Sequence, residues 1–316
     1  MHIEVRKQGA KKLYYLAHSF RAEDKVKKVR KYLGADLEKE TLSNLRKQAE
    51  KELLERAKSS ELISDPLNTV LSADEKKSIE ELIKRKGRGL DVLHLSEEDW
   101  KRFTQDFAYS TNAIEGSSVT SSEVQDMLKS DKWPAERTRQ EIAETYGVAE
   151  AVKYLRKTKE HLSVALIQEL HRLVFSNSLS YAGNFREKGV EVVVVDGSGN
   201  VIHRGAPQKD VVRRLKELTE WYRKNKNVYH PIVLAGVVHN QFENIHPFRD
   251  GNGRVGRLLL NNILIKHGMP PVNIELKNRT EYYGTLQAYE KEGDIRPTIE
   301  LILKEYRNLQ RHVTTK

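Results

Sequence analysis

The chain has 316 residues, of which 38% are hydrophobic and 32% are charged, so it suits two domains or one large domain with an appendage. It contains no cysteine, which excludes disulfides and thiol chemistry. No apolar run reaches transmembrane length and Met1 to Glu4 begins no signal peptide, so we expect a cytoplasmic protein without a membrane partner. The net charge is +10, and residues 1–60 hold 16 Lys and Arg against nine Asp and Glu.

The N-terminal region, residues 1–95, differs from the rest in its predicted strands and its basic charge. Residues 3–6 and 13–21 are predicted strands on either side of a turn at Gly9. A third strand or a helix start is expected near residues 25–33, followed by a charged helix over 36–58. Such a small basic α/β region could contact nucleic acid or an acidic partner. No helix-turn-helix or zinc-finger signature supports DNA, so a solvated basic face remains the alternative.

From Ser72 onward the chain is predicted to be almost entirely helical. Ser72–Glu75 forms a capping box ahead of the apolar residues Ile79, Leu82 and Ile83, and residues 87–89 break that helix. Ser96 caps a helix that passes Phe103 and Phe107. Further helices are expected over residues 121–130, 136–158, 163–175, 208–224, 231–245, 254–267, 279–291 and 297–311.

The most informative segment is residues 246–257, His-Pro-Phe-Arg-Asp-Gly-Asn-Gly-Arg-Val-Gly-Arg. A glycine-rich loop that enters a helix favours anion binding, because free N–H groups and the helix dipole face the ligand. Arg254 and Arg257 are three positions apart and are expected on one helix face. Asp250 could hold a magnesium ion that bridges phosphate oxygens, and His246 could take a proton from an attacking hydroxyl. The combination indicates phosphate-ester chemistry.

Two other interpretations of this segment are weaker. Gly251, Gly253 and Gly256 spell G-x-G-x-x-G, but the apolar pattern behind Pro231 predicts a helix where a dinucleotide fold needs a strand. A Walker-type phosphate loop is absent. A plain polar helix cap would require many unusual residues to coincide.

The same twelve residues resemble the core motif of the Fic family, HPFx(D/E)GNGRxxR, and match it at every position. Most Fic enzymes transfer AMP from ATP to a hydroxyl of a target protein. The resemblance covers about residues 96–311 and implies a Fic-type helical bundle in residues 96–316, with His246 as general base and Asp250 as magnesium ligand. It implies a nucleotide site along the loop and the first helical turn, made of Asp250, Gly251, Asn252, Gly253, Arg254, Val255, Gly256 and Arg257. In that site Gly251, Asn252 and Gly253 would be the anion hole, and Arg254 and Arg257 would clamp the outer phosphates.

Residues 111–116, Thr-Asn-Ala-Ile-Glu-Gly, resemble the inhibitory motif (S/T)xxxE(G/N) of many Fic proteins. In the family this glutamate, here Glu115, pairs with the second motif arginine, here Arg257, and occupies the place of the γ-phosphate. We therefore expect a bidentate pair between them and an autoinhibited enzyme. Taken alone, the hexapeptide would be an ordinary helix end with Gly116 after the cap.

Residues 190–195 and 201–204 predict a β-hairpin around the turn 196–200. The resemblance implies that it is the family's flap, which docks an extended target segment at Val201, Ile202, His203 and Arg204. Residues 183–186 and Pro207 also look like family surroundings. A surface hairpin without a role is the alternative.

Two further expectations concern the site. Residues 278–283 resemble the family region where a tyrosine borders the adenine, so Tyr282 and Tyr283 are candidates, with Tyr283 preferred. His239 precedes His246 by seven residues and could form a metal site with Asp250. We expect His239 to be structural instead.

The resulting expectation is a protein adenylyltransferase that uses ATP and Mg²⁺ to modify Ser, Thr or Tyr hydroxyls of target proteins, with a homodimer as a candidate assembly. One alternative is a related transferase that moves phosphate, UMP or phosphocholine, or an enzyme that removes AMP. The other is a nucleic-acid-binding regulator in which the Fic region senses nucleotide.

Overall fold

The computed structural model describes residues 1–9, 11–22, 25–64, 95–195 and 201–313, together with Ala73, Asp74, Lys77, Glu80 and Glu81. The predicted helix between Ser72 and the break at 87–89 lies almost entirely outside the described residues. The chain divides into two compact units, Met1–Leu71 and Ser72–Lys316. The predicted boundary at residue 95 stays a prediction, because most residues just before it are not described.

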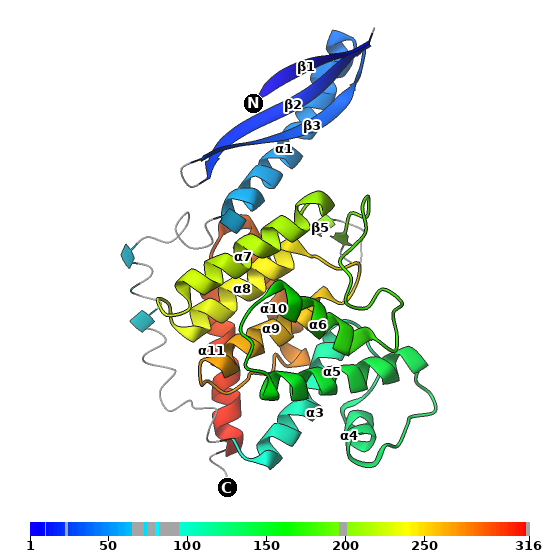
Figure 1. Cartoon of the computed structure of the whole chain (residues 1–316), viewed down its shortest axis with the longest axis vertical. Helices are drawn as coiled ribbons and strands as arrows, with labels where there is room; N and C mark the ends of the chain where they lie inside the picture. Colours follow the sequence, from blue (N-terminus) through cyan, green and yellow to red (C-terminus); the bar gives the residue numbers. More distant parts are fainter. Residues whose placement is uncertain are drawn as a thin grey trace. The chain divides into compact units, whose positions relative to one another are not determined.

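The first unit is an antiparallel sheet with one helix (Figure 1). The strands β1 (His2–Gln8), β2 (Lys11–Ala22) and β3 (Lys25–Ala35) pair in the order β1-β2-β3, and α1 (Lys39–Ser64) follows. Residues 25–35 form a full strand, so the alternative of a helix start there is wrong. Leu16 of β2 packs against Ala49 and Leu53 of α1 and forms the core of this unit.

The second unit is a bundle of helices, and side chains cap several of them, including the predicted cap at Ser96. Ser96, Thr120 and Thr138 each form a capping box with the acidic residue three positions later. The helices are α3 (Glu97–Ile114), α4 (Ser121–Ser130), α5 (Arg139–Lys157), α6 (Val164–Phe175), α7 (Val211–Asn225), α8 (Pro231–Ile245), α9 (Asn252–Lys266), α10 (Arg279–Glu292) and α11 (Arg296–Val313), with short 3₁₀ turns at Gln208–Asp210 and Leu276–Asn278.

Helix α9 lies at the centre of this bundle and contacts α3, α5, α6 and α8 (Figure 1). Residues Leu258 to Leu260 and Ile263 to Leu264 are almost completely buried, because neighbours cover the helix on several sides. A helix surrounded in this way cannot shift without repacking its neighbours. The bundle therefore fixes the position of the N-terminus of α9.

The predicted hairpin is present but shorter than expected. Strand β4 (Val193–Val195) pairs with β5 (Val201–Arg204), and the turn between them lies outside the described residues. The strand does not begin at Val190, whose carbonyl accepts from the Arg186 side chain instead. In the described part of the chain, no helix combines the length and apolarity needed to cross a membrane.

Candidate active site

The loop between α8 and α9 has a tightly specified backbone. His246 ends α8 in the left-handed conformation, with φ 50°. Asn252 closes the loop, because its Oδ1 accepts from the Phe248 N–H at 2.9 Å and its Nδ2 donates to the Phe248 carbonyl at 3.0 Å. Gly251 has φ 80°, and a Cβ there would lie 2.3 Å from the Phe175 ring. This position therefore excludes any side chain, on both backbone and steric grounds.

The N-terminus of α9 presents free backbone donors. Among the described residues, no side chain caps this helix, in contrast to α3, α4, α5, α6 and α8. The first N–H groups of a helix have no partner within the helix, so those of Asn252, Gly253 and Arg254 are available to an anion.

Gly253 and Gly256 of α9 both lack room for a Cβ, but for different reasons. A Cβ on Gly253 would lie 2.2 Å from Glu115 Oε1, so a carboxylate already lies against the first turn. A Cβ on Gly256 would lie 2.1 Å from Glu243 Oε1 and 3.1 Å from His239 Nδ1. Gly256 therefore allows α8 and α9 to approach closely, and its role is packing.

His246 is held as a neutral imidazole with one nitrogen free of the backbone. Its Nδ1 lies 3.2 Å from the Glu243 carbonyl, an acceptor, so Nδ1 carries the proton and Nε2 has the lone pair. Burial, followed by the nearby His203, lowers the pKa of His246 to about 3. The ring is therefore in its basic form at neutral pH.

Glu115 and Arg257 form the ion pair that the two motifs predict. Glu115 ends α3, and its Oε1 accepts from Arg257 Nη2 at 2.7 Å. The expected bidentate geometry is not formed, because Arg257 Nε donates to Thr111 Oγ1 and Nη1 donates to the Tyr282 hydroxyl. Burial opposes ionisation of Glu115, but the charge and hydrogen bond of Arg257 outweigh it and lower its pKa.

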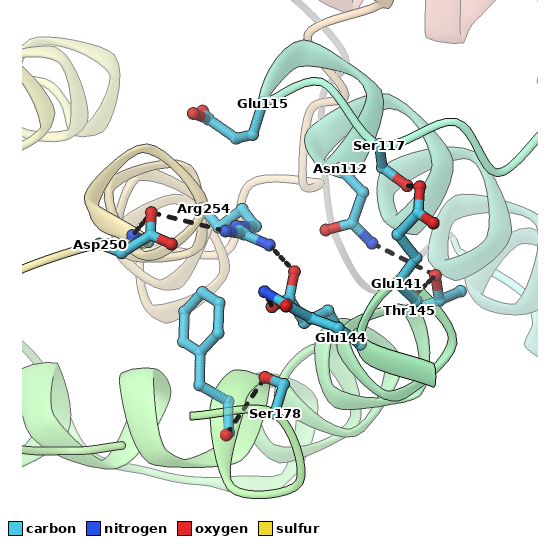
Figure 2. A network of polar contacts seen from close by, with 12 residues as sticks. Asn112, Glu115, Ser117, Glu141, Glu144, Thr145, Ser178, Asp250 and Arg254 are labelled. Carbon is cyan, nitrogen blue, oxygen red and sulfur yellow. Dashed lines mark hydrogen bonds and ion pairs between the residues drawn. The ribbon is translucent and has the colours of Figure 1, made fainter. Parts of the chain in front are cut away.

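The side chain of Arg254 extends from α9 to a different partner from that of Arg257. Its Nη1 pairs with Glu144 of α5, its Nη2 lies 3.9 Å from Asp250 Oδ1, and its guanidinium lies over the Phe175 ring (Figure 2). Figure 2 shows Arg254 between Asp250 and Glu144, with Glu115 at the end of α3 nearby. The two motif arginines share a helix face but are anchored separately. Glu144 was not anticipated from the sequence, because it lies 110 positions from Arg254.

Asp250 is the carboxylate best placed for a metal. Its side chain is 55% exposed, and its Oδ1 accepts from the Gly251 N–H at 2.6 Å. Within the described ranges, no group of three or more His, Cys, Asp or Glu side chains could hold a metal ion by itself.

The two candidate tyrosines have different surroundings. Tyr282 is only 1% exposed, and its hydroxyl lies between Arg257 Nη1 and His239 Nε2, at 3.2 and 3.1 Å. Tyr282 therefore holds Arg257 in place from within the core, and its buried ring is not accessible for stacking on an adenine base. Tyr283 is partly buried, and its hydroxyl donates to the Ile114 carbonyl at 3.4 Å, directly before Glu115. His239 is buried in this network, consistent with the structural role expected for it.

Glu243 is a buried carboxyl behind the site. Its Oε1 has no hydrogen-bond partner among the described residues. Burial raises the pKa of Glu243 to about 8, because the nearby Arg257 charge does not compensate for desolvation. The group is therefore mostly protonated at neutral pH.

Comparison with known proteins identifies this arrangement. Residues 161–264, which include His246 and the start of α9, match the Fic/DOC family. Over these residues the chain is similar to the Fic/DOC family.

Proteins of known function and known structure agree with that assignment. Protein adenylyltransferase Fic of Nematostella vectensis is 33% identical over 202 residues, which are 62% of this chain and 45% of that protein. Protein adenylyltransferase fic-1 of Caenorhabditis elegans is 32% identical over 215 residues, 66% of this chain and 41% of that protein. A solved structure of Fic-1 from C. elegans gives a TM-score of 0.63 at 25% identity, covering 87% of this chain and 86% of that chain. The chain thus spans less than half the length of these curated relatives.

Two residues to which the sequence analysis assigned no individual role position the loop between α8 and α9. His171 accepts from the Gly183 N–H at Nδ1, so its Nε2–H donates to the Asp250 carbonyl, at 2.8 and 3.1 Å. Arg186 is buried, and its Nε donates to the His246 carbonyl at 2.8 Å. The Arg186 guanidinium also donates to the Val190, Ala206 and Ile245 carbonyls, so it joins the base of the hairpin to the segment that carries His246.

The β4–β5 hairpin brings a second imidazole toward His246. His203 of β5 lies with its ring centre 5.7 Å from that of His246, and its Nδ1 is 2.8 Å from Glu290 Oε1. It therefore faces inward, whereas Arg204 is exposed. The side chains of Val201 and Ile202 lie outside the described residues, so their role in target docking stays a prediction.

Proposed function

We propose that this chain is a protein adenylyltransferase that transfers AMP from ATP to a hydroxyl of a target protein. One observation carries the proposal: the unprotonated Nε2 of His246 is held beside a helix N-terminus with free N–H groups and a buried arginine. A base next to an anion site is what the attack of a hydroxyl on a phosphate requires. The adenylyltransferase names of the relatives support this choice among phosphate reactions.

The chemistry would proceed by in-line displacement. A Ser, Thr or Tyr oxygen of the target forms a bond to the α-phosphorus while the bond from that phosphorus to the β-phosphate oxygen breaks, and pyrophosphate leaves. The proton of the attacking hydroxyl passes to His246 Nε2. The N–H groups of Asn252, Gly253 and Arg254 donate to phosphate oxygens and stabilise developing charge. Arg254, anchored by Glu144, and Arg257, once it is released from Glu115, would hold the outer phosphates.

Mg²⁺ fits this site as a cofactor held jointly with the nucleotide. Mg²⁺ commonly binds one or two carboxylates together with substrate phosphates, and Asp250 is a half-exposed carboxylate at the loop. The ion would neutralise charge on the leaving diphosphate.

The resting state is proposed to be autoinhibited by Glu115. Its carboxylate already lies against Gly253 and accepts from Arg257, so it occupies an anion position at the N-terminus of α9. A bound triphosphate would have to displace this carboxylate or place its terminal phosphate elsewhere. A contact in the proposed homodimer would change how firmly α3 packs on the active site. The homodimer stays a prediction, because a single chain is described.

Adenine is proposed to lie near Tyr283. Of the two adjacent tyrosines, Tyr283 keeps part of its ring exposed and lies beside the end of α3. An aromatic face can stack on a purine. The Tyr283→Ala protein should bind ATP more weakly by calorimetry, and an unchanged affinity would remove Tyr283 from the site.

The decisive experiment follows label transfer from α-³²P-ATP and from γ-³²P-ATP, with mass spectrometry of the modified residue. We expect an AMP-sized addition from the α-label, and its loss in His246→Ala with ATP binding retained. His161→Ala is a matched control, because this histidine lies on the Tyr222 hydroxyl away from the loop. A phosphate-sized addition would establish the alternative transferase, and wild-type transfer by His246→Ala would refute the assigned base.

A further inference from the structure

The sheet of the N-terminal unit has one face that α1 covers and one face that α1 leaves uncovered. Strand alternation places Ile3, Leu16 and Val29 on the same face, and these residues pack with Ala49 and Leu53 of α1. Helix α1 therefore covers this face (Figure 1). The opposite face of the sheet is not covered by α1.

The outer face carries a surplus of positive charge. The strand register aligns the side chains of this face in rows across the strands. Its charged residues among those described are Arg6, Lys11, Lys28, Arg30 and a single carboxylate, Glu4. Glu4 accepts from Arg30 Nε at 2.8 Å, also pairs with Lys28, and lies 3.9 Å from Arg6. Exposed ion pairs of this kind contribute little stability, so exchanging Glu4 for the phosphates of a polyanion costs these cations little.

Two aromatic rings lie in the middle of these cations. Tyr15 and Tyr32 are cross-strand partners with ring centres 5.3 Å apart, and the Arg6 guanidinium lies 5.3 Å from the Tyr15 ring centre. Tyr32 is 51% exposed, although a large aromatic side chain gains by burial. Exposed rings among cations favour a ligand with both phosphates and apolar base surfaces.

The geometry points to duplex DNA as that ligand: we propose that the outer face of β1-β2-β3 binds in its major groove. Two neighbouring strands of this face, about 4.8 Å apart, can enter a B-form major groove about 12 Å wide, which admits a two-stranded β-ribbon, and the third strand then lies near the phosphates. The major groove of A-form RNA is too narrow to admit it. Arg and Lys side chains suit phosphates and guanine edges. This inference does not depend on AMP transfer.

The test measures the affinity of the full-length chain for a mixed-sequence 20-base-pair DNA by fluorescence anisotropy at several salt concentrations. We expect a Kd in the micromolar range at low salt, weakening steeply as salt rises. The variant Arg6→Gln/Lys28→Gln/Arg30→Gln should bind on the order of a hundredfold more weakly at 0.1 M salt, with a salt slope smaller by about 3. The matched control Arg46→Gln/Lys47→Gln/Lys51→Gln removes the same charge from exposed positions of α1 and should bind nearly as wild type does.

A second variant guards against misfolding of the triple variant. Glu4→Gln removes the only carboxylate of the outer face among the described residues, so it should bind DNA severalfold more tightly. Three results would overturn the proposal: no binding of wild type at low salt, equal weakening by the α1 control, or equal affinity for double-stranded RNA, single-stranded DNA or polyglutamate.

Discussion

Glu115 and Arg257 are 142 positions apart in the chain, yet Oε1 of the first lies 2.7 Å from Nη2 of the second. The contact forms against Gly253, in the first turn of α9. The arginine is fully buried and the glutamate side chain is 29% exposed, so the glutamate is the partner that can leave. Its departure would open an anion position without disturbing the core around Arg257.

Replacement of Glu115 tests the proposed autoinhibition. The Glu115→Gly protein should increase self-modification with radiolabelled ATP by on the order of a hundredfold, because a charge-assisted pair of a few kcal/mol no longer competes with the phosphates. Glu136→Gly, at an exposed turn, is the control and should be unchanged. Arg257→Ala should not be activated, since it also removes the proposed phosphate clamp. Equal, appreciable activity in wild type and Glu115→Gly would leave residues 111–116 as an ordinary helix end.

Substitution of Gly253 tests the contact between Glu115 and α9 through the free energy of unfolding. A Cβ there would lie 2.2 Å from Glu115 Oε1, so Gly253→Ala should cost about 1–3 kcal/mol in wild type by denaturant unfolding. In the Glu115→Gly background most of that cost should disappear, because the nearest remaining atom is Arg257 Nη1 at 3.1 Å. A double-mutant cycle measures the difference. Additive effects of the two substitutions would mean that the carboxylate does not lie on Gly253 in solution.

Arg186 is predicted to be a positioning residue for His246. Arg186→Leu removes the donors that join the hairpin base to the His246 carbonyl, so kcat should fall about a hundredfold, the order expected for a misplacement near 1 Å. ATP affinity should remain close to that of wild type, because Arg186 does not contact α9's first turn. Arg186→Lys should restore little, since an ammonium cannot reach several carbonyls with a planar fork. The control is Arg172→Leu, which breaks an exposed pair with Glu169. A parallel loss of kcat and ATP affinity would contradict the positioning role.

Glu243 predicts a pH dependence of stability. Its folded-state pKa of about 8 is above the ordinary 4.5, so the folded protein holds a proton that the unfolded chain releases. Stability from this group is complete below about pH 4.5 and is lost as the pH rises through 8, by a few kcal/mol in total. Glu243→Gln should therefore gain stability relative to wild type as the pH rises from 5 to 8 in urea unfolding. Glu136→Gln should show no such trend, and a flat difference for Glu243→Gln would refute the buried neutral carboxyl.

Local features of this fold were predictable because they depend on short-range hydrogen bonds. The capping box at Ser96 and the loop that feeds α9 are encoded by side chains within a few residues of the backbone groups they bind. The pairing of Glu115 with Arg257 was predictable only through the family resemblance, which connects two distant motifs.

Partners of buried charges could not be predicted, because tertiary packing selects them. Nothing near Arg254 in the sequence indicates Glu144, and nothing near His246 indicates Arg186. The environments of Tyr282 and Tyr283 likewise depend on which side of α10 meets α8, and α10 shows only weak periodicity. The bidentate geometry expected for Arg257 failed for the same reason, since Thr111 and Tyr282 compete for its donors.

The position of Glu115 in the chain also has a consequence during protein synthesis. The ribosome makes Glu115 142 residues before Arg257, and domains tend to fold as their segments emerge. The carboxylate is therefore available before the guanidinium exists, and α9 cannot complete its packing without meeting it. Under the proposed autoinhibition, a newly made molecule therefore has no interval in which the anion position at α9 is assembled but Glu115 is absent.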